Sequence, residues 1–256
     1  MSQKTTKDIR SAKGKEKIAM LTAYDYPTAS ILDEAGIDIL LVGDSLGNVI
    51  LGYPNTLRVT LEMMIHHTQA VVRGTKNALV VADMPFGTYQ ASTAQAVGNA
   101  SRLLSEGHAH AIKLEGGKIM AETVKRLVDV GIPVMGHIGL TPQSIHEFGG
   151  YFMHGKTHPE AERLMEDAMA LEKAGAFCLV LECVEPELAK HITQHSSIPT
   201  IGIGSGEACD GQVLVTHDLL NFTTHKVPKF VKQNANLRSV ISESVMSYIK
   251  GVKEEK

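Results

Sequence analysis

Acidic residues end several apolar runs of strand length in this chain. Residues 39–46 read Ile-Leu-Leu-Val-Gly-Asp-Ser-Leu, so that this run ends in Asp44 and Ser45. Similar runs end in Asp25, Asp83, Glu115 and Glu182. A continuous apolar run bounded by turns is typical of a parallel strand buried on both faces. Because parallel strands share one direction, we expect these acids to gather at one rim of a sheet or barrel.

Gathered carboxylates repel one another unless a cation or a shared proton compensates their charge. No His or Cys ligand spacing accompanies these acids, so oxygen ligands favour a hard cation, Mg²⁺ or Mn²⁺. Mg²⁺ usually takes only one or two carboxylates directly, which leaves other acids able to act as a base. Spacing alone does not separate ligand from base. A strand-end Asp is also a common helix cap, whereas Glu115 and Glu182 are poor cap types.

Three further residues could take part in chemistry at the same rim. Lys113 precedes Glu115 by two positions, so both side chains point to the same side of the strand. There Lys113 would pair with the acids or hold an anionic substrate; a Schiff-base role ranks lower, because clustered acids keep an amine charged. Ser45 could donate to a substrate carboxylate or cap the next turn. His137 could polarise a carbonyl or be structural.

Strand-like runs alternate with helical segments along the whole chain. Strands are expected at 18–25, 39–43, 79–82, 111–114, 133–137, 177–181, 199–203 and 211–215, and the longer helices at 27–35, 60–73, 91–107, 118–130, 158–174, 186–194 and 236–250. About eight such pairs with no linker predict a single (β/α)₈ TIM barrel over 1–256. Residues 1–16 would be an extension with a short helix over one end, and 251–256 a peripheral tail.

A doubly wound open sheet is the alternative fold. It would normally show a GxGxxG turn after the first strand, where this chain has Thr22-Ala-Tyr-Asp25. In a barrel, active sites lie at the C-terminal ends of the strands, where the acids fall.

Composition argues against several classes of partner. The chain has 256 residues, a formal net charge of −3 and no basic tract, which disfavours nucleic acid and membrane surfaces. No apolar run reaches the roughly 18 residues of a membrane span. The N-terminal residues lack the apolar core of a secretory signal, and the three cysteines form no CxxC pair. We therefore expect a cytoplasmic protein.

Seven motifs, taken together and in order, resemble the ketopantoate hydroxymethyltransferase family between about residues 18 and 232. They are Thr22–Tyr26, Leu41–Gly47, Lys113–Gly117, Gly136–Ser144, Phe148–Tyr151, Leu181–Val184 and Pro228–Phe230. The resemblance implies a barrel of the phosphoenolpyruvate/pyruvate type that assembles as a homodecamer. It also implies the first step towards pantothenate, in which 3-methyl-2-oxobutanoate takes a hydroxymethyl group from 5,10-methylenetetrahydrofolate through a Mg²⁺-stabilised enolate.

The resemblance also implies roles for particular residues. Mg²⁺ would bind at Asp44, Asp83 and Glu115. The oxoacid would contact Asp44, Ser45, Asp83 and Lys113. Glu182 would accept the proton, and His137 matches an active-site histidine of the family.

Two other functions compete with this interpretation. A Mg²⁺-dependent carbon–carbon lyase or aldolase of the isocitrate lyase type would share the acids, but it would usually carry a catalytic cysteine in a Lys-Lys-Cys-Gly-type loop, which this sequence lacks. A non-catalytic barrel could bind a small acid as a sensor. The presence of every candidate ligand and of the base argues against the second alternative.

Overall fold

Eight parallel strands close into a barrel in the computed structural model, which describes residues 3–150 and 152–254. The strands are β1 (Ile18–Thr22), β2 (Ile39–Val42), β3 (Leu79–Asp83), β4 (Ala111–Glu115), β5 (Val134–Gly139), β6 (Cys178–Glu182), β7 (Thr200–Ile203) and β8 (Gly211–Leu214). They neighbour one another in sequence order. The predicted (β/α)₈ barrel is therefore confirmed, and the open sheet is excluded. Tyr151 of the expected motif and the outermost ends of the chain lie outside the described residues.

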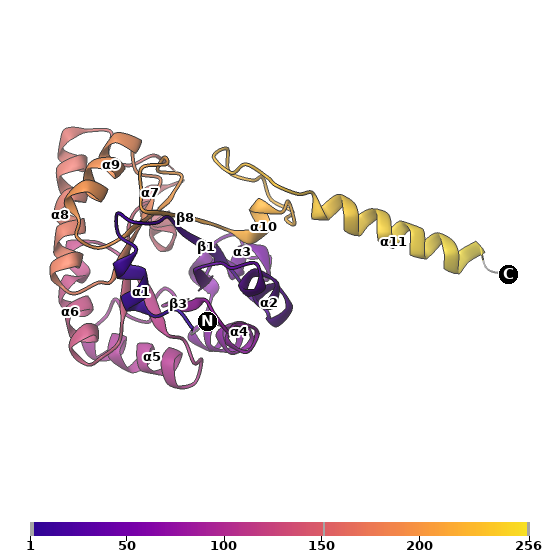
Figure 1. The fold of residues 1–256 in the computed structure, drawn as a ribbon, viewed down its shortest axis with the longest axis horizontal. Helices are drawn as coiled ribbons and strands as arrows, with labels where there is room; N and C mark the ends of the chain where they lie inside the picture. Colours follow the sequence, from indigo (N-terminus) through magenta and orange to yellow (C-terminus); the bar gives the residue numbers. More distant parts are fainter. Residues whose placement is uncertain (1–2, 151, 255–256) are drawn as a thin grey trace. The chain divides into compact units, whose positions relative to one another are not determined.

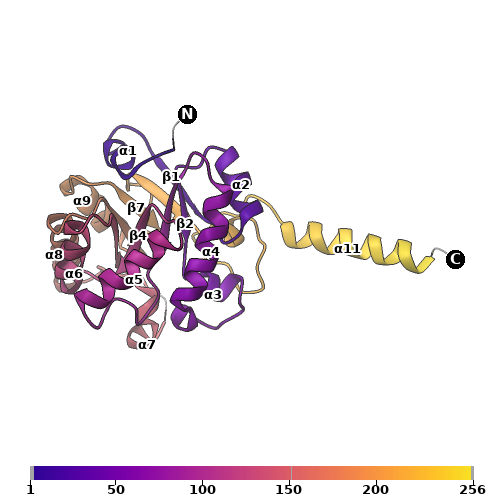
Figure 2. The same ribbon diagram turned by 90° about the horizontal axis from the view of Figure 1, so that it is seen from below.

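The longer helices follow the strands on the outside of the barrel (Figures 1 and 2). They are α2 (Tyr26–Glu34), α4 (Leu61–Gly74), α5 (Thr93–Ser105), α6 (Ala121–Asp129), α8 (His158–Lys173) and α9 (Pro186–His195). The side chains of Asp25, Thr60 and Ser92 accept backbone N–H groups at the starts of α2, α4 and α5, respectively. These caps satisfy donors that a helix cannot pair internally. All of these helices lie within a few residues of the predicted ranges.

Short helices occupy the connections. They are α3 (Leu46–Val49), η1 (Thr56–Arg58), η2 (Lys118–Met120), η3 (Pro142–Ser144) and α7 (Ile145–Phe148). Figure 2 shows α3 and α7 at one end of the strands and α1 (Thr6–Ser11) at the other. The first two follow the C-terminal ends of β2 and β5, so they border the mouth of the barrel.

Two hydrophobic cores hold the barrel together. One fills the interior with alternate strand residues such as Met20, Leu41, Val81 and Met135. The other lies between the strands and the outer helices and includes Leu40. Burying one such side chain contributes about 1.5–3 kcal/mol. The filled interior restricts polar chemistry to the ends of the strands.

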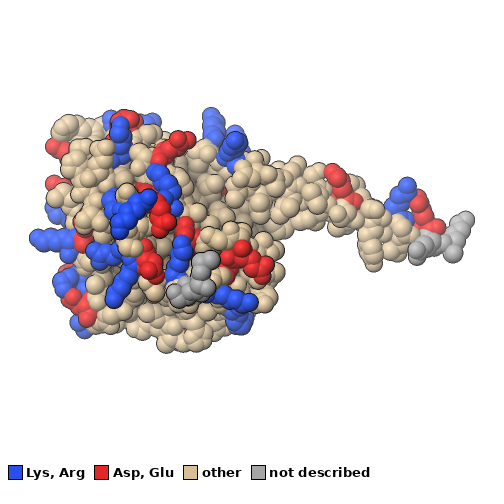
Figure 3. All heavy atoms as spheres, in the orientation of Figure 1, with Lys and Arg blue, Asp and Glu red and all other residues tan. Residues whose placement is uncertain are grey.

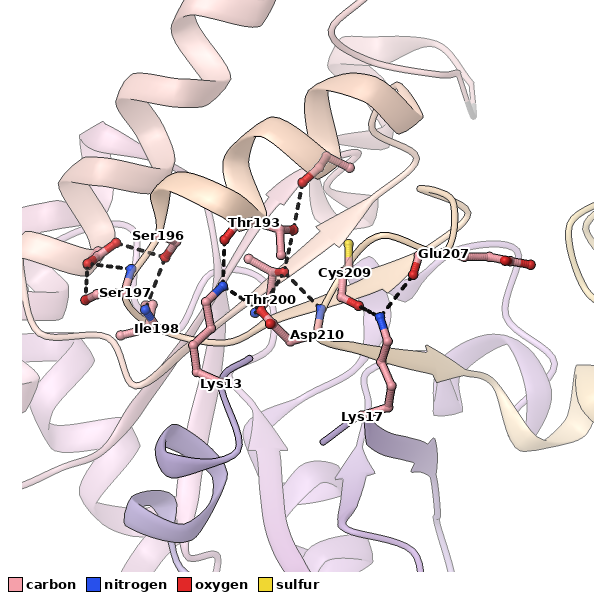
Figure 4. Close-up of polar contacts among 12 residues, drawn as sticks. Lys13, Lys17, Thr193, Ser196, Ser197, Ile198, Thr200, Glu207, Cys209 and Asp210 are labelled. Carbon is pink, nitrogen blue, oxygen red and sulfur yellow. Dashed lines mark hydrogen bonds and ion pairs between the residues drawn. The ribbon is translucent and has the colours of Figure 1, made fainter. Parts of the chain in front are cut away.

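The N-terminal segment covers the end of the barrel at which the strands begin. Ile9 of α1 and Ala12 are buried in the interior core. Lys13 Nζ donates to the carbonyl of Thr193 at 2.6 Å and to Asp210 Oδ2 at 2.7 Å (Figure 4). The same carboxylate oxygen accepts the backbone N–H of Thr200 at 2.9 Å. The predicted short helix over one end of the fold is present, and these contacts tie it to the starts of β7 and β8.

Figure 3 shows charged side chains of both signs interspersed over one face of the barrel. Some form pairs, such as Arg102 with Glu106 at 2.7 Å and Lys118 with Glu166 at 3.0 Å. Exposed pairs of this kind contribute little to stability, with typical values of about 0–1 kcal/mol.

Contacts divide the chain into one compact unit that ends at Val213 and a second that begins at Leu214. The second contains α10 (Thr216–Leu219) and α11 (Leu237–Glu254), and within it Asp218 Oδ1 lies 2.9 Å from His225 Nε2. No described residue of α11 is buried. Across the described ranges, every helix is too short or too polar to span a bilayer. A single domain over 1–256 stays a prediction.

Candidate active site

Strand register brings the candidate residues together at the mouth of the barrel. Asp83 is paired with Lys113 across β3 and β4, Glu115 with His137 across β4 and β5, and Gly139 with Glu182 across β5 and β6. Side chains two positions apart on a strand point to the same side. The side chains of Lys113 and Glu115 therefore point to the same side of β4, and the register sets Asp83 and His137 beside them.

The ammonium group of Lys113 lies at the centre of this arrangement. Its Nζ is 3.1 Å from Asp83 Oδ1 and 3.2 Å from His137 Nδ1. Burial alone would lower the pKa of Lys113, but the charges of Asp83, Glu115 and Asp44 outweigh it and raise the pKa. The amine is thus held in its charged form, which favours binding of an anion over Schiff-base chemistry.

His137 connects Lys113 to Glu182. Burial, followed by the positive charge of Lys113, lowers the pKa of His137, so the ring is neutral. Because Lys113 can only donate, Nδ1 must accept, and the ring proton resides on Nε2. Nε2 lies 3.1 Å from Glu182 Oε2, although it is not aligned as a hydrogen bond. The ring therefore lies against the Glu182 carboxylate as a close polar contact.

The other acids are almost completely buried. Asp44 is 4% exposed and Glu115 is 6% exposed. Burial and the negative charge of Asp83 raise the pKa of Asp44 to about 7. Burial also raises the pKa of Glu115 well above its ordinary value, and the charge of Asp44 adds to the effect. One lysine does not compensate this group of carboxylates, so the site favours a further cation.

The carboxylate oxygens at the mouth of the barrel are of the donor type that Mg²⁺ prefers. Asp83 Oδ1 is buried without a hydrogen bond, apart from its ion pair with Lys113. Within residues 3–150 and 152–254, no group of three or more His, Cys, Asp or Glu side chains is arranged so that it could hold a metal ion by itself. Mg²⁺ needs only one or two carboxylates when water and substrate oxygens complete its shell. Coordination by Asp44, Asp83 and Glu115 stays a prediction.

Ser45 and Asp25 resolve two of the open alternatives. Ser45 stands at the start of α3 but makes no side-chain capping bond; its Oγ lies 2.8 Å from the hydroxyl of Tyr24. It is therefore placed as a polar group at the mouth, not as a cap. Asp25 instead accepts the N–H of Thr28 at 2.8 Å. For Asp25, the helix-cap interpretation is correct.

Two neutral residues of the site were not anticipated from the sequence. Tyr89 lies between β3 and α5, and Gln143 lies in η3. Gln143 contacts both Asp44 and Glu115. The only sequence signal was the position of Gln143 inside the Gly136–Ser144 motif, because a search for charged strand ends passes over neutral loop residues.

The barrel and its acidic mouth define a class, that of α/β-barrel enzymes whose polar site lies at the C-terminal ends of the strands. The family model described as ketopantoate hydroxymethyltransferase matches residues 3–256. The chain belongs to this family.

Relatives of known name agree with this assignment. A 3-methyl-2-oxobutanoate hydroxymethyltransferase of Syntrophus aciditrophicus (strain SB) is 58% identical over 250 residues, which covers 97% of this chain and 92% of the relative. One of Dehalococcoides mccartyi (strain ATCC BAA-2266 / KCTC 15142 / 195) is 60% identical and covers 92% and 83%.

Among solved structures, phosphoenolpyruvate phosphomutase from Streptomyces platensis subsp. rosaceus superposes with a TM-score of 0.66 at 12% identity and covers 99% of this chain and 89% of that chain. A 2,3-dimethylmalate lyase of the PEP mutase/isocitrate lyase superfamily gives 0.61 at 15% identity and covers 98% and 88%. At these identities the likeness shows the barrel fold, and the phosphoenolpyruvate/pyruvate type of barrel stays a prediction.

Proposed function

We propose that this chain transfers a hydroxymethyl group from 5,10-methylenetetrahydrofolate to 3-methyl-2-oxobutanoate, which gives 2-dehydropantoate and tetrahydrofolate in the first step towards pantothenate. One observation carries the proposal. It is the row of contacts from Asp83 through Lys113 and His137 to Glu182, which supports a role for Lys113 in binding an acid substrate and for Glu182 in taking a proton. The names of the relatives support the choice of substrate.

Each residue has a defined part in the reaction. The Lys113 ammonium and the Ser45 hydroxyl bind the carboxylate of the oxoacid. Asp44, Asp83 and Glu115 would hold Mg²⁺, which when bound withdraws charge from the keto oxygen and makes the C3 proton more acidic.

Glu182 accepts the C3 proton, and His137 Nε2 lies 3.1 Å from its carboxylate oxygen Oε2. The electron pair released at C3 forms the new bond to the one-carbon unit. In methylenetetrahydrofolate that carbon is bonded to two folate nitrogens, and both of these bonds break in the course of the reaction. Water supplies the hydroxyl oxygen, and the proton taken from C3 and the second proton of the water end on the two nitrogens of tetrahydrofolate.

Two further properties belong to this proposal. The family resemblance suggests a homodecamer, and the exposed apolar side chains of α11 support self-association, since such residues are usually covered by a partner. They include Val240, Ile241, Val245, Tyr248, Ile249 and Val252. A cytoplasmic location follows from the folate co-substrate and from the expectation based on composition.

A turnover assay tests the proposal. The purified chain is supplied with the oxoacid, methylenetetrahydrofolate and Mg²⁺, and 2-dehydropantoate is measured by mass spectrometry. We expect product only with all three components, and loss of product after chelation with EDTA that added Mg²⁺ restores. Cleavage of a carbon–carbon bond without folate would favour the lyase alternative, and binding of the oxoacid without turnover would favour a sensor.

A further inference from the structure

We propose that Gln143 and Tyr89 are positioning residues that fix the carboxylates of Asp44 and Glu115 in the orientation in which they receive the cation. The inference rests on the proposed function, because it concerns the ion that the acids would hold. Neither residue is charged, and both are buried: Gln143 is 5% exposed and Tyr89 is 1% exposed.

Gln143 contacts both acids through different groups. Its side-chain Nε2 donates to Asp44 Oδ2 at 2.9 Å, and its backbone N–H donates to Glu115 Oε2 at 3.0 Å. Asp44 follows β2 and Glu115 ends β4. A single residue of η3 therefore sets the relative placement of carboxylates that come from two separate strands.

The orientation of the Gln143 amide is determined from both sides. Nε2 also donates to the carbonyl of Met84 at 3.0 Å, while Oε1 accepts from the Tyr89 hydroxyl at 2.8 Å and from Gln90 Nε2 at 3.2 Å. Both donors and both lone pairs of the amide are thus used. Rotation by 180° would place Oε1 against a carbonyl and a carboxylate. Only the observed orientation presents N–H groups to Asp44.

Tyr89 links this amide to the backbone of Glu115. Its hydroxyl accepts the N–H of Glu115 at 3.1 Å and donates to Gln143 Oε1 at 2.8 Å, the shorter of two contacts open to its single proton; the other is the carbonyl of Glu115 at 3.2 Å. The hydroxyl group thereby holds the end of β4 and the amide of Gln143 at once. In a buried network with every partner present, the members support one another more than separate pairs do.

The chemistry of a neutral amide suits this place. An acid at position 143 would add a negative charge beside Asp44, and an apolar residue would leave the Asp44 carboxylate free to rotate. Gln143 binds Oδ2 of Asp44 through its side chain and Oε2 of Glu115 through its backbone N–H. The other oxygen of each carboxylate is then left for the cation. Groups that orient ligands in this way typically contribute about 10–100-fold to metal affinity.

The test compares Mn²⁺ binding, followed by electron paramagnetic resonance, in the unaltered chain and in Q143M, Y89F and the double variant. Gln69→Met is the matched control, because Gln69 lies on α4 and donates to the carbonyl of Glu106 at the surface. Circular dichroism melts confirm that each variant is folded.

We expect each single variant to bind Mn²⁺ about 10-fold more weakly, and the double variant to lose less than the product of the two, since the residues act as one unit. The Mg²⁺ concentration for half-maximal turnover should rise, while the KM for the oxoacid at saturating Mg²⁺ changes little. Gln69→Met should match the unaltered chain.

The outcomes separate the inference from the proposed function. Unchanged Mn²⁺ affinity in a folded Q143M or Y89F variant would overturn the positioning role and leave the proposed function intact. If the loss of Mn²⁺ affinity in the double variant equals the product of the two single losses, the residues act independently, and the idea of a coupled pair is overturned. A chain that binds no Mn²⁺ before any substitution would overturn the metal site, and this inference with it.

Discussion

Glu182 differs from the other acids of the site in its access to solvent. Its side chain is 16% exposed, whereas those of Asp83 and Glu115 are each 4% exposed. A carboxylate that must reach a substrate proton has to lie at the open side of the site, and a carboxylate that holds an ion can be enclosed. The exposures of the acids therefore support their division into base and ligands.

The Glu182→Gln variant tests this division at the level of one atom. The amide keeps the size of the side chain but cannot take a proton, so exchange of the oxoacid C3 proton in deuterated water should fall by about 10²–10⁴-fold. Oxoacid binding should persist. Nuclear magnetic resonance follows the exchange, with Glu187→Gln on the exposed face of α9 as the control. Exchange at the original rate would exclude Glu182 as the base.

The sequence identified the charged residues of the site but could not assign all their roles. Asp25 and Asp83 both end strand runs, yet the first caps α2 and the second contacts Lys113. Whether such an acid caps the next helix or faces the mouth of the barrel depends on the direction in which the chain leaves the strand, and tertiary packing sets that direction. Gln143 was missed for a related reason, since its importance comes from contacts with residues 99 and 28 positions away.

Among the elements, β5 has a feature that only glycine provides. Gly139 has φ +93°, and a Cβ added there would lie 2.3 Å from the carbonyl oxygen of Glu182. The end of β5 thus approaches the backbone of the proposed base more closely than any other residue type allows.

Gly139→Ala should push the end of β6 outward and displace Glu182. Because a shift of about 1 Å can cost about 100-fold in rate, we expect kcat to fall on that order, with reduced thermal stability. Gly98→Ala is the control, since Gly98 lies in α5 with nothing within 4 Å of the added carbon. That variant should be active and slightly more stable. Equal activity of the two variants would show that the close approach is unimportant.

A second element-level device joins α2 to the segment before β3. The carboxylate of Asp33 accepts the backbone N–H groups of Lys76, Asn77 and Ala78, at 2.7–3.2 Å. Burial would raise the pKa of Asp33, but these hydrogen bonds outweigh it and lower the pKa. The charged form of Asp33 is therefore the one that stabilises the fold.

Asp33→Asn should lower the free energy of unfolding at pH 7 by about 1.5–3 kcal/mol, the range for hydrogen bonds to a charged group. A lowered folded-state pKa contributes stability that is complete above the unfolded value of about 3.9 and is lost as the pH falls towards the folded value. The difference between the two proteins in urea unfolding should thus shrink below about pH 4. The control is Asp129→Asn, at an exposed residue of α6, which should have only a small effect on the free energy of unfolding at pH 7. A difference for Asp33→Asn that stays constant as the pH falls would contradict this account.

Elements with strong periodicity were predictable, and short ones were not. The strands and longer helices follow from buried apolar runs and helical spacing. The helices α3, α7 and α10 contain four residues each, too few to show a period. Their lengths depend on where the connecting chain meets the barrel, which the local sequence does not encode.

At the scale of the whole molecule, the (β/α)₈ arrangement was predictable because eight repeats of one pattern admit few other folds. The division of contacts at Val213 and Leu214 was not expected, since no linker composition marks it. A boundary of this kind depends on how many contacts cross it, and a sequence pattern carries no such count.

Coverage of the N-terminal ends of the strands has a consequence for the order in which reactants bind and products leave. Ile9 and Ala12 close that end. The reactants and products of the proposed reaction therefore all pass through the opening at the C-terminal ends of the strands. For the proposed reaction, this predicts that the compact oxoacid enters before the bulkier folate and that tetrahydrofolate departs before 2-dehydropantoate. We expect inhibition by 2-dehydropantoate to be competitive with the oxoacid, and inhibition by tetrahydrofolate to be noncompetitive with its methylene form. The closed N-terminal end of the barrel, which carries no catalytic group, would in this way determine the order of binding and release.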